Sequence, residues 1–244
     1  MEKKFIVVIP ARLKSSRLPN KPLLKIKGVP MIIRTFKQCN KVVKKENIFV
    51  ATDSSKIASL CREHNINTVI TSSKCKTGTD RVFEVSKKIK AENYINVQGD
   101  EPIFNPKDLT VMISNLSRKK NYNKVLLGYC EFNSKKIMNN KNIPKVIFDK
   151  NNKLLYATRS PVPSLKQGLI SKGYRQVLVY VYPKIIIKNF KKIYNKKKLL
   201  EKSEDIEILR FLENGINVRL IKMSDQSKSV DTIKDLNTVR KLIN

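Results

Sequence analysis

The loop at residues 10–23 carries the side chains best suited to binding phosphate. Among its basic residues, Arg12, Arg17 and Lys21 lie among small and turn-forming residues after the apolar run 5–9. Guanidinium groups bind phosphate oxygens in bidentate fashion, and an ammonium adds a movable point charge. Such a set suits a triphosphate, because its leaving pyrophosphate gains charge during reaction. The Gly-x-x-x-x-Gly-Lys pattern of a Walker loop is absent, and a solvated basic loop is the alternative interpretation.

A second segment, residues 98–102, has the sequence Gln-Gly-Asp-Glu-Pro and favours metal binding. Asp100 lies just past a buried strand pattern, and Gly99 lets the backbone approach a ligand closely. Mg²⁺ commonly takes one or two protein carboxylates together with substrate phosphates, so a second carboxylate is expected. Asp231, just before the last predicted helix, is the best candidate, with a role as a simple helix-start residue as the alternative. The sequence therefore predicts Mg²⁺ as the cofactor.

A turn at residues 77–81, Thr-Gly-Thr-Asp-Arg, leads into a predicted helix. The first backbone N–H groups of a helix have no partner within it, so they can bind a base or ribose edge. Any helix start would look similar, and the turn is weak evidence by itself.

The periodicity of apolar residues predicts the elements that must position these segments. Strand patterns occur at residues 5–9, 48–51, 68–71 and 94–97, and helix patterns at residues 29–43, 54–64 and 79–89. Asp53 is a candidate cap for the second of these helices. The alternating order predicts an α/β fold with a mostly parallel, doubly wound sheet. Ligands in such sheets bind beyond the carboxyl ends of the strands, where the segments above lie.

The pattern changes after about residue 120. Strands are expected at residues 124–130, 146–148, 154–157 and 177–182, with fewer helices, which fits a smaller antiparallel extension. A helix at 203–213, a strand at 218–221 and a helix at 233–243 then follow, and Thr232 with Asp235 forms a capping box for the last helix. Without repeats or a linker, we expect a single domain over 1–244. Its nucleotide-binding half would span about 1–120 and its acceptor region about 121–200.

Composition limits the class of protein. Lys and Arg number 51 against 20 acidic residues, for a net charge of +31, and such a surface often binds nucleic acid. The lysines are spread along the chain and interleaved with asparagine, without a ribonucleoprotein motif, zinc knuckle or heptad. Compositional bias is therefore the favoured explanation, and a basic nucleic-acid-binding protein on an α/β scaffold is the alternative.

Cysteine, histidine and hydropathy exclude several kinds of site. The four cysteines lie far apart without a Cys-x-x-Cys pair, so we expect free thiols rather than zinc or disulfides. His64 is the single histidine, so chemistry that needs a histidine base would depend on it alone. No apolar run is long enough to span a bilayer, and the first residues are not a secretory signal. We expect a cytoplasmic protein that does not bind membranes.

Together these segments resemble the 3-deoxy-manno-octulosonate (Kdo) cytidylyltransferases, the CMP-Kdo synthetases. The resemblance covers nearly the whole chain and keeps the order of motifs. The matching segments are residues 9–12, 16–23, 28–32, 51–53, 77–81, 96–102, 158–163 and 230–232. The resemblance implies a GT-A-like nucleotidyltransferase fold, CTP as donor, an acidic sugar as acceptor, and a homodimer. Attack by the anomeric hydroxyl on the α-phosphate needs no histidine base, because metal coordination lowers the pKa of the hydroxyl.

The resemblance also implies roles for individual residues. Those at the nucleotide are Ala11, Arg12, Arg17, Lys21, Thr77 and Gly78, with the last two at the cytosine. Those facing the sugar acid are Gln98, Arg159, Gln176, Tyr180 and Glu207. Asp100 and Asp231 would bind Mg²⁺, and Arg12, Lys21 and Asp100 would be catalytic.

Departures from the family are concentrated in the acceptor half. Where the family has His-x-Gly-x-Tyr, this chain keeps Tyr180 but has Gln176 and Leu178 in place of the histidine and glycine. Where it has Leu-Glu-Gln-Leu-Arg, this chain keeps Glu207 but replaces the amide by Ile208. Losing a hydrogen-bonding group changes which hydroxyls are recognised. We therefore hypothesise a nonulosonate or amino-Kdo acceptor as the alternative to Kdo. A sugar 1-phosphate nucleotidyltransferase is disfavoured, because those enzymes usually begin with a glycine-rich loop.

Overall fold

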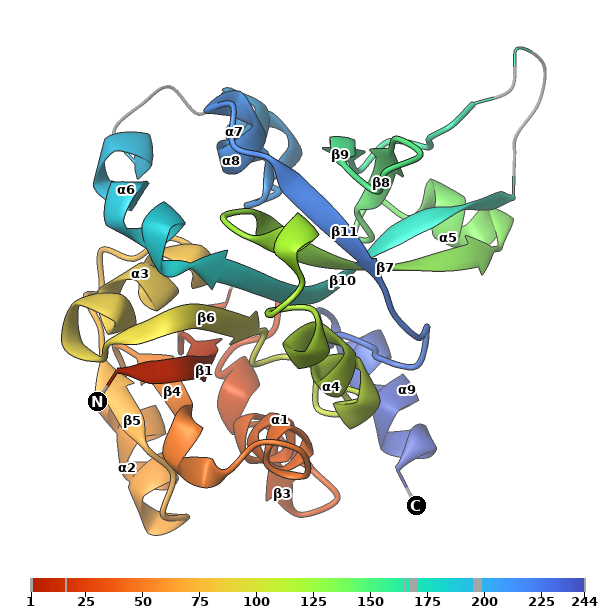
Figure 1. The fold of residues 1–244 in the computed structure, drawn as a ribbon. Helices are drawn as coiled ribbons and strands as arrows, with labels where there is room; N and C mark the ends of the chain where they lie inside the picture. The colour runs from red at the N-terminus through yellow and green to blue at the C-terminus, as the bar shows by residue number, and fades with distance from the viewer. Residues whose placement is uncertain (1, 16, 165, 167–170, 195–198, 244) are drawn as a thin grey trace. The chain divides into compact units, whose positions relative to one another are not determined.

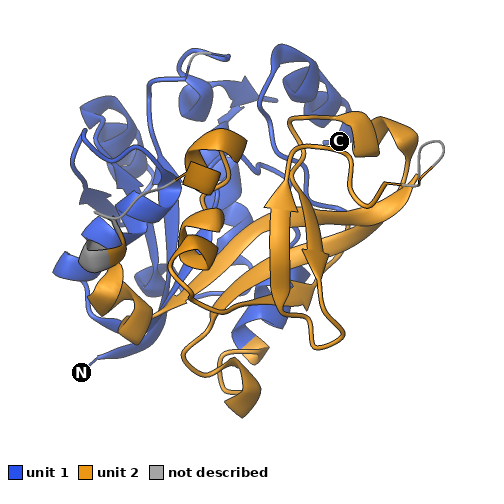
Figure 2. Cartoon of the chain, turned by 90° about the horizontal axis from the view of Figure 1, so that it is seen from above, with its two compact units in different colours: residues 1–113, 226–244 blue, residues 114–225 orange. Residues whose placement is uncertain are grey.

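The chain forms two compact units in the computed structural model, which describes residues 2–15, 17–164, 166, 171–194 and 199–243. Figure 2 colours them separately: unit 1 is residues 1–113 with 226–244, and unit 2 is residues 114–225. The C-terminal segment therefore belongs to the same unit as the N-terminal strand. Ser16, in the predicted phosphate loop, lies outside the described residues.

Unit 1 contains a parallel sheet (Figure 1). Its strands, in the spatial order β6–β1–β4–β5, are β1 (Lys3–Ala11), β4 (Ile48–Thr52), β5 (Thr68–Ile70) and β6 (Ala91–Val97). Strand β1 is buried from Ile6 to Ala11 on both faces, which explains why its sequence is continuously apolar instead of alternating. Its register places Val7 opposite Ile48. The predicted parallel sheet is confirmed.

The described helices of unit 1 include those that the alternation of patterns predicted between the strands. They are α1 (Met31–Asn40), α2 (Ser55–Glu63), α3 (Gly78–Lys88), α4 (Pro106–Ser114) and α9 (Ile233–Leu242). Single 3-10 turns occur at η1 (Lys21–Leu23) and η2 (Lys45–Asn47). The predicted helix at 29–43 is shorter than expected. Val29–Pro30 is strand β3, which pairs with β2 (Lys25–Ile26), and Pro30 precedes the first helical residue.

The predicted cap of the second helix is wrong by one residue. Ser54 has an extended backbone, and its hydroxyl accepts a hydrogen bond from the Ile57 amide at 3.4 Å, so Ser54 is the N-cap of α2. Asp53 instead forms an ion pair with Arg81, whose Nη2 lies 3.1 Å from Oδ1 of Asp53. Aspartate and serine are both favoured at the N-cap, so the sequence alone does not decide between these two neighbours. The ion pair of Asp53 with a distant residue decides it.

Unit 2 is mainly antiparallel, which confirms the smaller extension. The strand β10 (Lys172–Pro183) runs antiparallel to β7 (Val125–Asn133), and β8 (Lys145–Phe148) runs antiparallel to both β9 (Leu154–Thr158) and β10. Strand β11 (Val218–Lys222) is parallel to β7.

The helical content of unit 2 exceeds the prediction. Besides the turn η3 (Lys119–Asn121), its helices are α5 (Lys135–Asn139), α6 (Lys184–Tyr194), α7 (Leu199–Glu204) and α8 (Leu209–Glu213). The single helix predicted at 203–213 is wrong, because Asp205 has a left-handed φ of 51° and separates α7 from α8. The carbonyl of Glu204, at the end of α7, accepts a hydrogen bond from the Arg159 side chain.

Candidate active site

Three predicted segments emerge at one edge of the unit 1 sheet. Ala11 at the end of β1 lies opposite Thr52 of β4, so Arg12 and Asp53 leave their strands at the same edge. Gln98 follows β6, which is parallel to β1 on its other side. This is the edge at which open α/β sheets bind ligands.

Lys21 joins the two carboxylates predicted to bind metal. Its Nζ lies 2.5 Å from Oδ2 of Asp100 and 3.2 Å from Oδ1 of Asp231. The side chain of Lys21 is 14% exposed, and the two aspartates are 24% and 22% exposed. Burial by itself would lower the pKa of Lys21, but the two carboxylates outweigh burial, and the pKa lies above its ordinary value. The ammonium is therefore held in its charged form between two anions.

Arg17, from the same loop as Lys21, contacts the same cluster. Its Nη2 lies 3.0 Å from Oδ1 of Asp231, and its side chain is 52% exposed. Two of the predicted phosphate-binding cations thus converge on the carboxylates.

The two carboxylates have the chemistry of a site for a hard divalent cation. Oδ1 of Asp100 is buried, and no described residue gives it a hydrogen bond. A buried carboxylate oxygen requires a donor or a cation. The described part of the chain contains no group of three or more His, Cys, Asp or Glu side chains that could hold a metal. Two carboxylates completed by phosphate and water oxygens are the usual arrangement for Mg²⁺.

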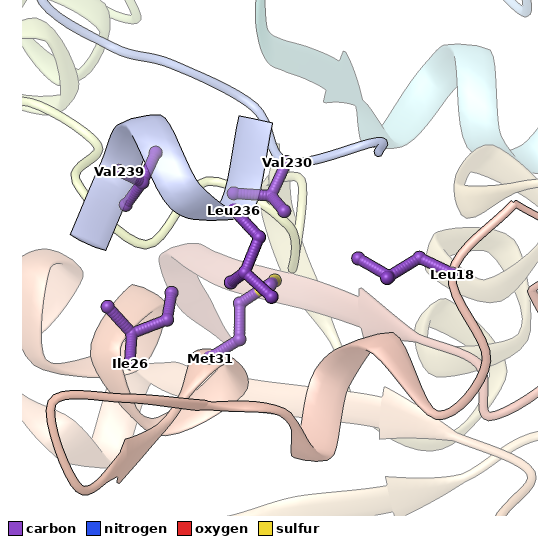
Figure 3. Close-up of a cluster of buried hydrophobic side chains, with 6 residues drawn as sticks. All are labelled: Leu18, Ile26, Met31, Val230, Leu236 and Val239. Atoms are coloured by element: carbon purple, nitrogen blue, oxygen red, sulfur yellow. The ribbon is translucent and has the colours of Figure 1, made fainter. Parts of the chain in front are cut away.

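An apolar cluster joins the phosphate loop to the segment that carries Asp231. Figure 3 shows its buried members, which are Leu18, Ile26, Met31, Val230, Leu236 and Val239. The Val230 amide also donates to the carbonyl of Asp100 at 2.9 Å. Residues far apart in sequence are thereby fixed beside one another, and the carboxylate of Asp231 follows directly after this contact.

The contacts at the start of α9 show whether the Asp231 side chain caps this helix. Thr232 is the N-cap and forms the predicted capping box with Asp235. The Asp231 amide donates to Oδ2 of Asp235 at 3.2 Å, whereas the Asp231 carboxylate contacts Lys21 and Arg17. The side chain of Asp231 is therefore not used to cap the helix.

The turn before α3 is tied to the phosphate loop. Thr77 is the N-cap of α3 and forms a capping box with Asp80, whose Oδ2 also accepts from the Lys76 amide at 3.0 Å. Nη1 of Arg12 donates to the carbonyl of Lys76 at 3.2 Å. Sequence reasoning recognised the helix start but missed the capping box, although Thr77 and Asp80 have the required spacing.

Replacing Thr77 with valine should destabilise the protein by about 1 kcal/mol, because the side chain keeps its shape but loses the capping oxygen. Thr77→Ser retains that oxygen and should stay close to the parent protein. Urea unfolding measures both variants. Equal loss of stability in the two variants would contradict a capping role for the hydroxyl.

Close packing requires glycine at position 99 and leaves little space at position 78. A Cβ at Gly99 would lie 2.6 Å from the carbonyl oxygen of Pro10, so only glycine fits there. A Cβ at Gly78 would lie 3.1 Å from Nε2 of Gln98. Gln98, predicted to face the sugar acid, thus lies against the helix start predicted to contact cytosine.

Sequence reasoning did not single out Arg81, which is buried beside this turn. Nη1 donates to the Thr71 hydroxyl at 2.6 Å, and Nη2 contacts Asp53 at 3.1 Å. These partners follow strands β5 and β4, so Arg81 ties α3 to two strand ends. The arginine falls within the quoted turn motif, but its partners are long-range and no local pattern identifies them.

The acceptor residues Gln176 and Tyr180 contact each other within β10. Nε2 of Gln176 donates to the Tyr180 hydroxyl, across a register shift in the pairing of β10 with β7 between Val177 and Tyr180. Gln176 is 4% exposed, and its Oε1 has no hydrogen-bond partner in the described part of the chain. Leu178 is half-buried on the same strand.

Arg159, also predicted to face the sugar acid, is engaged by its own unit. Its Nε donates to the Glu204 carbonyl at 2.6 Å, Nη1 to the Lys141 carbonyl at 2.9 Å and Nη2 to the Asp205 carbonyl at 2.7 Å. Its backbone amide donates to Oε2 of Glu204 at 2.8 Å. The guanidinium thus orders the chain that follows β9.

Lys145 is a second buried cation that sequence reasoning missed. Its Nζ donates to the carbonyls of Asn140, Ile143 and Arg159 at 3.0, 3.0 and 2.8 Å. Burial, with a smaller contribution from the charge of Arg159, lowers the pKa of Lys145. In so lysine-rich a chain, no pattern distinguishes this lysine from those on the surface.

Replacing Glu204 with glutamine should cost about 1–3 kcal/mol of stability, because the carboxylate accepts hydrogen bonds from both Thr158 and the Arg159 amide. The glutamine amide would turn a donor toward one of these donors. The exposed Glu63→Gln is the control for loss of one charge. Thermal unfolding of the two variants at equal protein concentration measures the difference, and equal midpoints would contradict the proposed network.

The remaining predicted residues have simple environments. Glu207 lies between α7 and α8, and the neighbouring Ile208 is fully buried. His64 is exposed at the end of α2.

The four cysteines are free thiols, as predicted. Within the described residues, every helix is too short or too polar to cross a membrane.

The chain resembles proteins of one family along nearly its whole length. The family described as Cytidylyltransferase matches residues 6–224. The 3-deoxy-manno-octulosonate cytidylyltransferase of Chloroherpeton thalassium is 33% identical over 242 residues, covering 98% of both chains. That of Koribacter versatilis is 35% identical over 241 residues, covering 98% of this chain and 90% of the relative.

A solved structure gives the same relationship. CMP:2-keto-3-deoxy-manno-octonic acid synthetase complexed with CTP matches at a TM-score of 0.90 and 31% identity, covering 99% of this chain and 98% of that one. The predicted α/β nucleotidyltransferase fold is thereby confirmed. The chain belongs to the cytidylyltransferase family and is a CTP-dependent cytidylyltransferase.

Proposed function

We propose that this protein transfers CMP from CTP to a 2-keto-3-deoxy sugar acid, with Kdo as the first acceptor to test. The products are the CMP-sugar and pyrophosphate. Mg²⁺ is the proposed cofactor, held by Asp100 and Asp231. The relatives named above support Kdo, because they are 3-deoxy-manno-octulosonate cytidylyltransferases.

One observation carries the proposal: two carboxylates and two cations meet beside the strand ends of unit 1. Asp100 and Asp231 share Lys21, and Arg17 reaches Asp231. A triphosphate with a divalent cation has the complementary charges, since the carboxylates attract the metal and the basic side chains attract the phosphates.

The reaction is an in-line displacement at the α-phosphorus. The anomeric hydroxyl oxygen of the acid forms the new P–O bond, the bond to the β-phosphate oxygen breaks, and the hydroxyl proton is lost to solvent. Bound Mg²⁺ would neutralise phosphate charge and lower the pKa of the attacking hydroxyl. Arg12, Arg17 and Lys21 would hold the triphosphate and stabilise the charge that develops on pyrophosphate.

Other residues are proposed to select the nucleotide and the acid. Ala11 and Arg12 would also contact the nucleotide. Thr77 and Gly78 would lie at its cytosine. The proposed contacts to the sugar acid are Gln98, Arg159, Gln176, Tyr180 and Glu207. To bind the acid, Arg159 would have to give up one of the carbonyl groups to which its guanidinium donates. Its direct structural role is to order the chain that follows β9. A homodimer remains part of the proposal from the family resemblance.

A different acid sugar is the second candidate acceptor. The buried Oε1 of Gln176 has no partner in the described structure, so it can accept a hydrogen bond from a ligand. An acceptor with an additional donor, such as an amino-Kdo or a nonulosonate, would satisfy it. Direct nucleic-acid binding has no comparable observation in its favour.

Pyrophosphate release tests the choice of acceptor. The protein is incubated with CTP and Mg²⁺ and with Kdo, an amino-Kdo or a nonulosonate in turn, and initial rates are compared. The proposal expects the largest kcat/KM with Kdo. A larger value with the amino sugar or the nonulosonate would favour the second candidate, and no release with any acid would contradict both.

A further inference from the structure

The cluster of Lys21, Asp100 and Asp231 already contains a cation that belongs to the protein. The ammonium lies at hydrogen-bond distance from both carboxylates, 2.5 Å from one and 3.2 Å from the other. Only 14% of the lysine side chain is exposed. This is a largely enclosed contact, unlike the half-exposed contact of Arg17 with Asp231.

A divalent cation would need the same space. Mg²⁺ binds carboxylate oxygens at about 2.0–2.1 Å and requires near-octahedral geometry. The oxygens that face Lys21 are Oδ2 of Asp100 and Oδ1 of Asp231, so a cation held by both carboxylates would compete with the ammonium for them. An ammonium and a divalent cation at contact distance from the same oxygens would repel each other.

Contacts within the protein itself place the two carboxylates beside each other. The Val230 amide donates to the Asp100 carbonyl at 2.9 Å, and Val230 and Leu18 belong to the same buried apolar cluster. Two anions fixed side by side would repel each other without a cation. Lys21 provides that cation, and its flexible four-carbon stem allows the ammonium to leave without moving the backbone.

We propose that Lys21 is a placeholder cation, which occupies the metal position of the free protein and moves to the phosphate oxygens when the metal–nucleotide complex binds. This inference rests on the metal site proposed above. It goes further by assigning one side chain to two successive sites, and it makes metal binding and nucleotide binding mutually dependent.

Metal binding and nucleotide binding depend on each other because the metal competes with the Lys21 ammonium for the carboxylates. A metal ion arriving alone must displace an ammonium that is part of the same chain and therefore has a high effective concentration. A metal ion arriving with a triphosphate brings new anionic partners for the displaced ammonium. Each ligand consequently strengthens binding of the other by the same factor.

The test measures metal binding without nucleotide or acceptor. Mn²⁺ is titrated into the metal-free protein, and free Mn²⁺ is followed by electron paramagnetic resonance. A titration of the same CTP concentration without protein is subtracted, because the triphosphate itself binds Mn²⁺. The parent protein should bind Mn²⁺ weakly when alone and at least tenfold more tightly with CTP present. Lys21→Met should bind Mn²⁺ alone at least tenfold more tightly than the parent protein and should lose most of the gain from CTP.

Matched variants exclude a general charge effect and a folding defect. Lys25→Met removes an exposed positive charge on the neighbouring strand β2 and should leave Mn²⁺ binding unchanged. In EDTA, the thermal midpoint of Lys21→Met should fall below that of the parent protein and should recover when Mn²⁺ is added. If Lys21→Met does not fold, Lys21→Gln replaces it in the same titration.

The outcomes separate this inference from the proposed metal site. If Lys21→Met binds Mn²⁺ alone no more tightly than the parent protein, while the parent protein binds it with CTP, the placeholder role is wrong. If the parent protein and Lys21→Met fail to bind Mn²⁺ both with and without CTP, the metal site itself is wrong.

Discussion

Replacing Asp100 with asparagine should nearly abolish CMP transfer and leave the protein folded. An amide has nearly the shape of a carboxylate but carries no charge, so it is a poor ligand for Mg²⁺. The effect should reach roughly 100- to 1,000-fold in kcat, the usual cost of removing one group that stabilises developing charge. The backbone contact between Val230 and Asp100 does not use the side chain and is retained.

The measurement is steady-state pyrophosphate release at saturating CTP and acceptor, with thermal unfolding as the check on folding. Asp225→Asn, an exposed substitution of the same type, is the matched control and should remain fully active. Activity of Asp100→Asn within a few-fold of the parent protein would remove Asp100 from the metal site.

The largest loss of stability is expected from Arg210→Met in unit 2. Arg210 is 1% exposed, and its Nε donates to Oε2 of Glu201 at 2.8 Å while Nη2 contacts Oε1 of the same carboxylate. The guanidinium also lies over the Phe190 ring, 5.3 Å from its centroid. Removing one partner of a buried ion pair costs about 3–5 kcal/mol, because the other charge stays buried without compensation.

A double variant distinguishes this cause from simple loss of packing. Arg210→Met combined with Glu201→Leu removes both charges and should recover much of the stability lost in the single variant. Urea unfolding of the two single variants, the double variant and the parent protein gives the coupling free energy. A double variant no more stable than Arg210→Met would show that the unpaired carboxylate is not the source of the loss.

Local patterns in the sequence were sufficient for most of the fold. The apolar run of β1, the amphipathic pattern of α1 and the capping box at Thr232 depend on neighbouring residues, and each was predicted near its observed place. The α7–α8 break was missed, because Asp205 adopts its left-handed φ beside a carbonyl that accepts from distant Arg159. A local pattern contains no information about such a partner.

In the candidate site too, the sequence identified individual residues but not the contacts between them. Asp100 and Asp231 were recognised because each lies within three residues of a strand end or a helix start, and Lys21 was recognised as a phosphate-binding cation. Their joint contact could not be derived from spacing, since it depends on the packing of Leu18 and Val230 in one apolar cluster. Buried Lys145 and Arg81 were missed for the same reason, because burial of a cation is decided by tertiary contacts.

Phosphorus NMR of the complete reaction tests the central claim most directly. With CTP, Kdo, Mg²⁺ and the parent protein, the triphosphate signals should disappear while one phosphodiester signal and one pyrophosphate signal grow in a 1:2 intensity ratio, because each pyrophosphate carries two phosphorus atoms. UTP and ATP in place of CTP should give neither signal at a comparable rate. Stoichiometric release of inorganic phosphate, or pyrophosphate without a phosphodiester, would contradict transfer of CMP to a sugar acid.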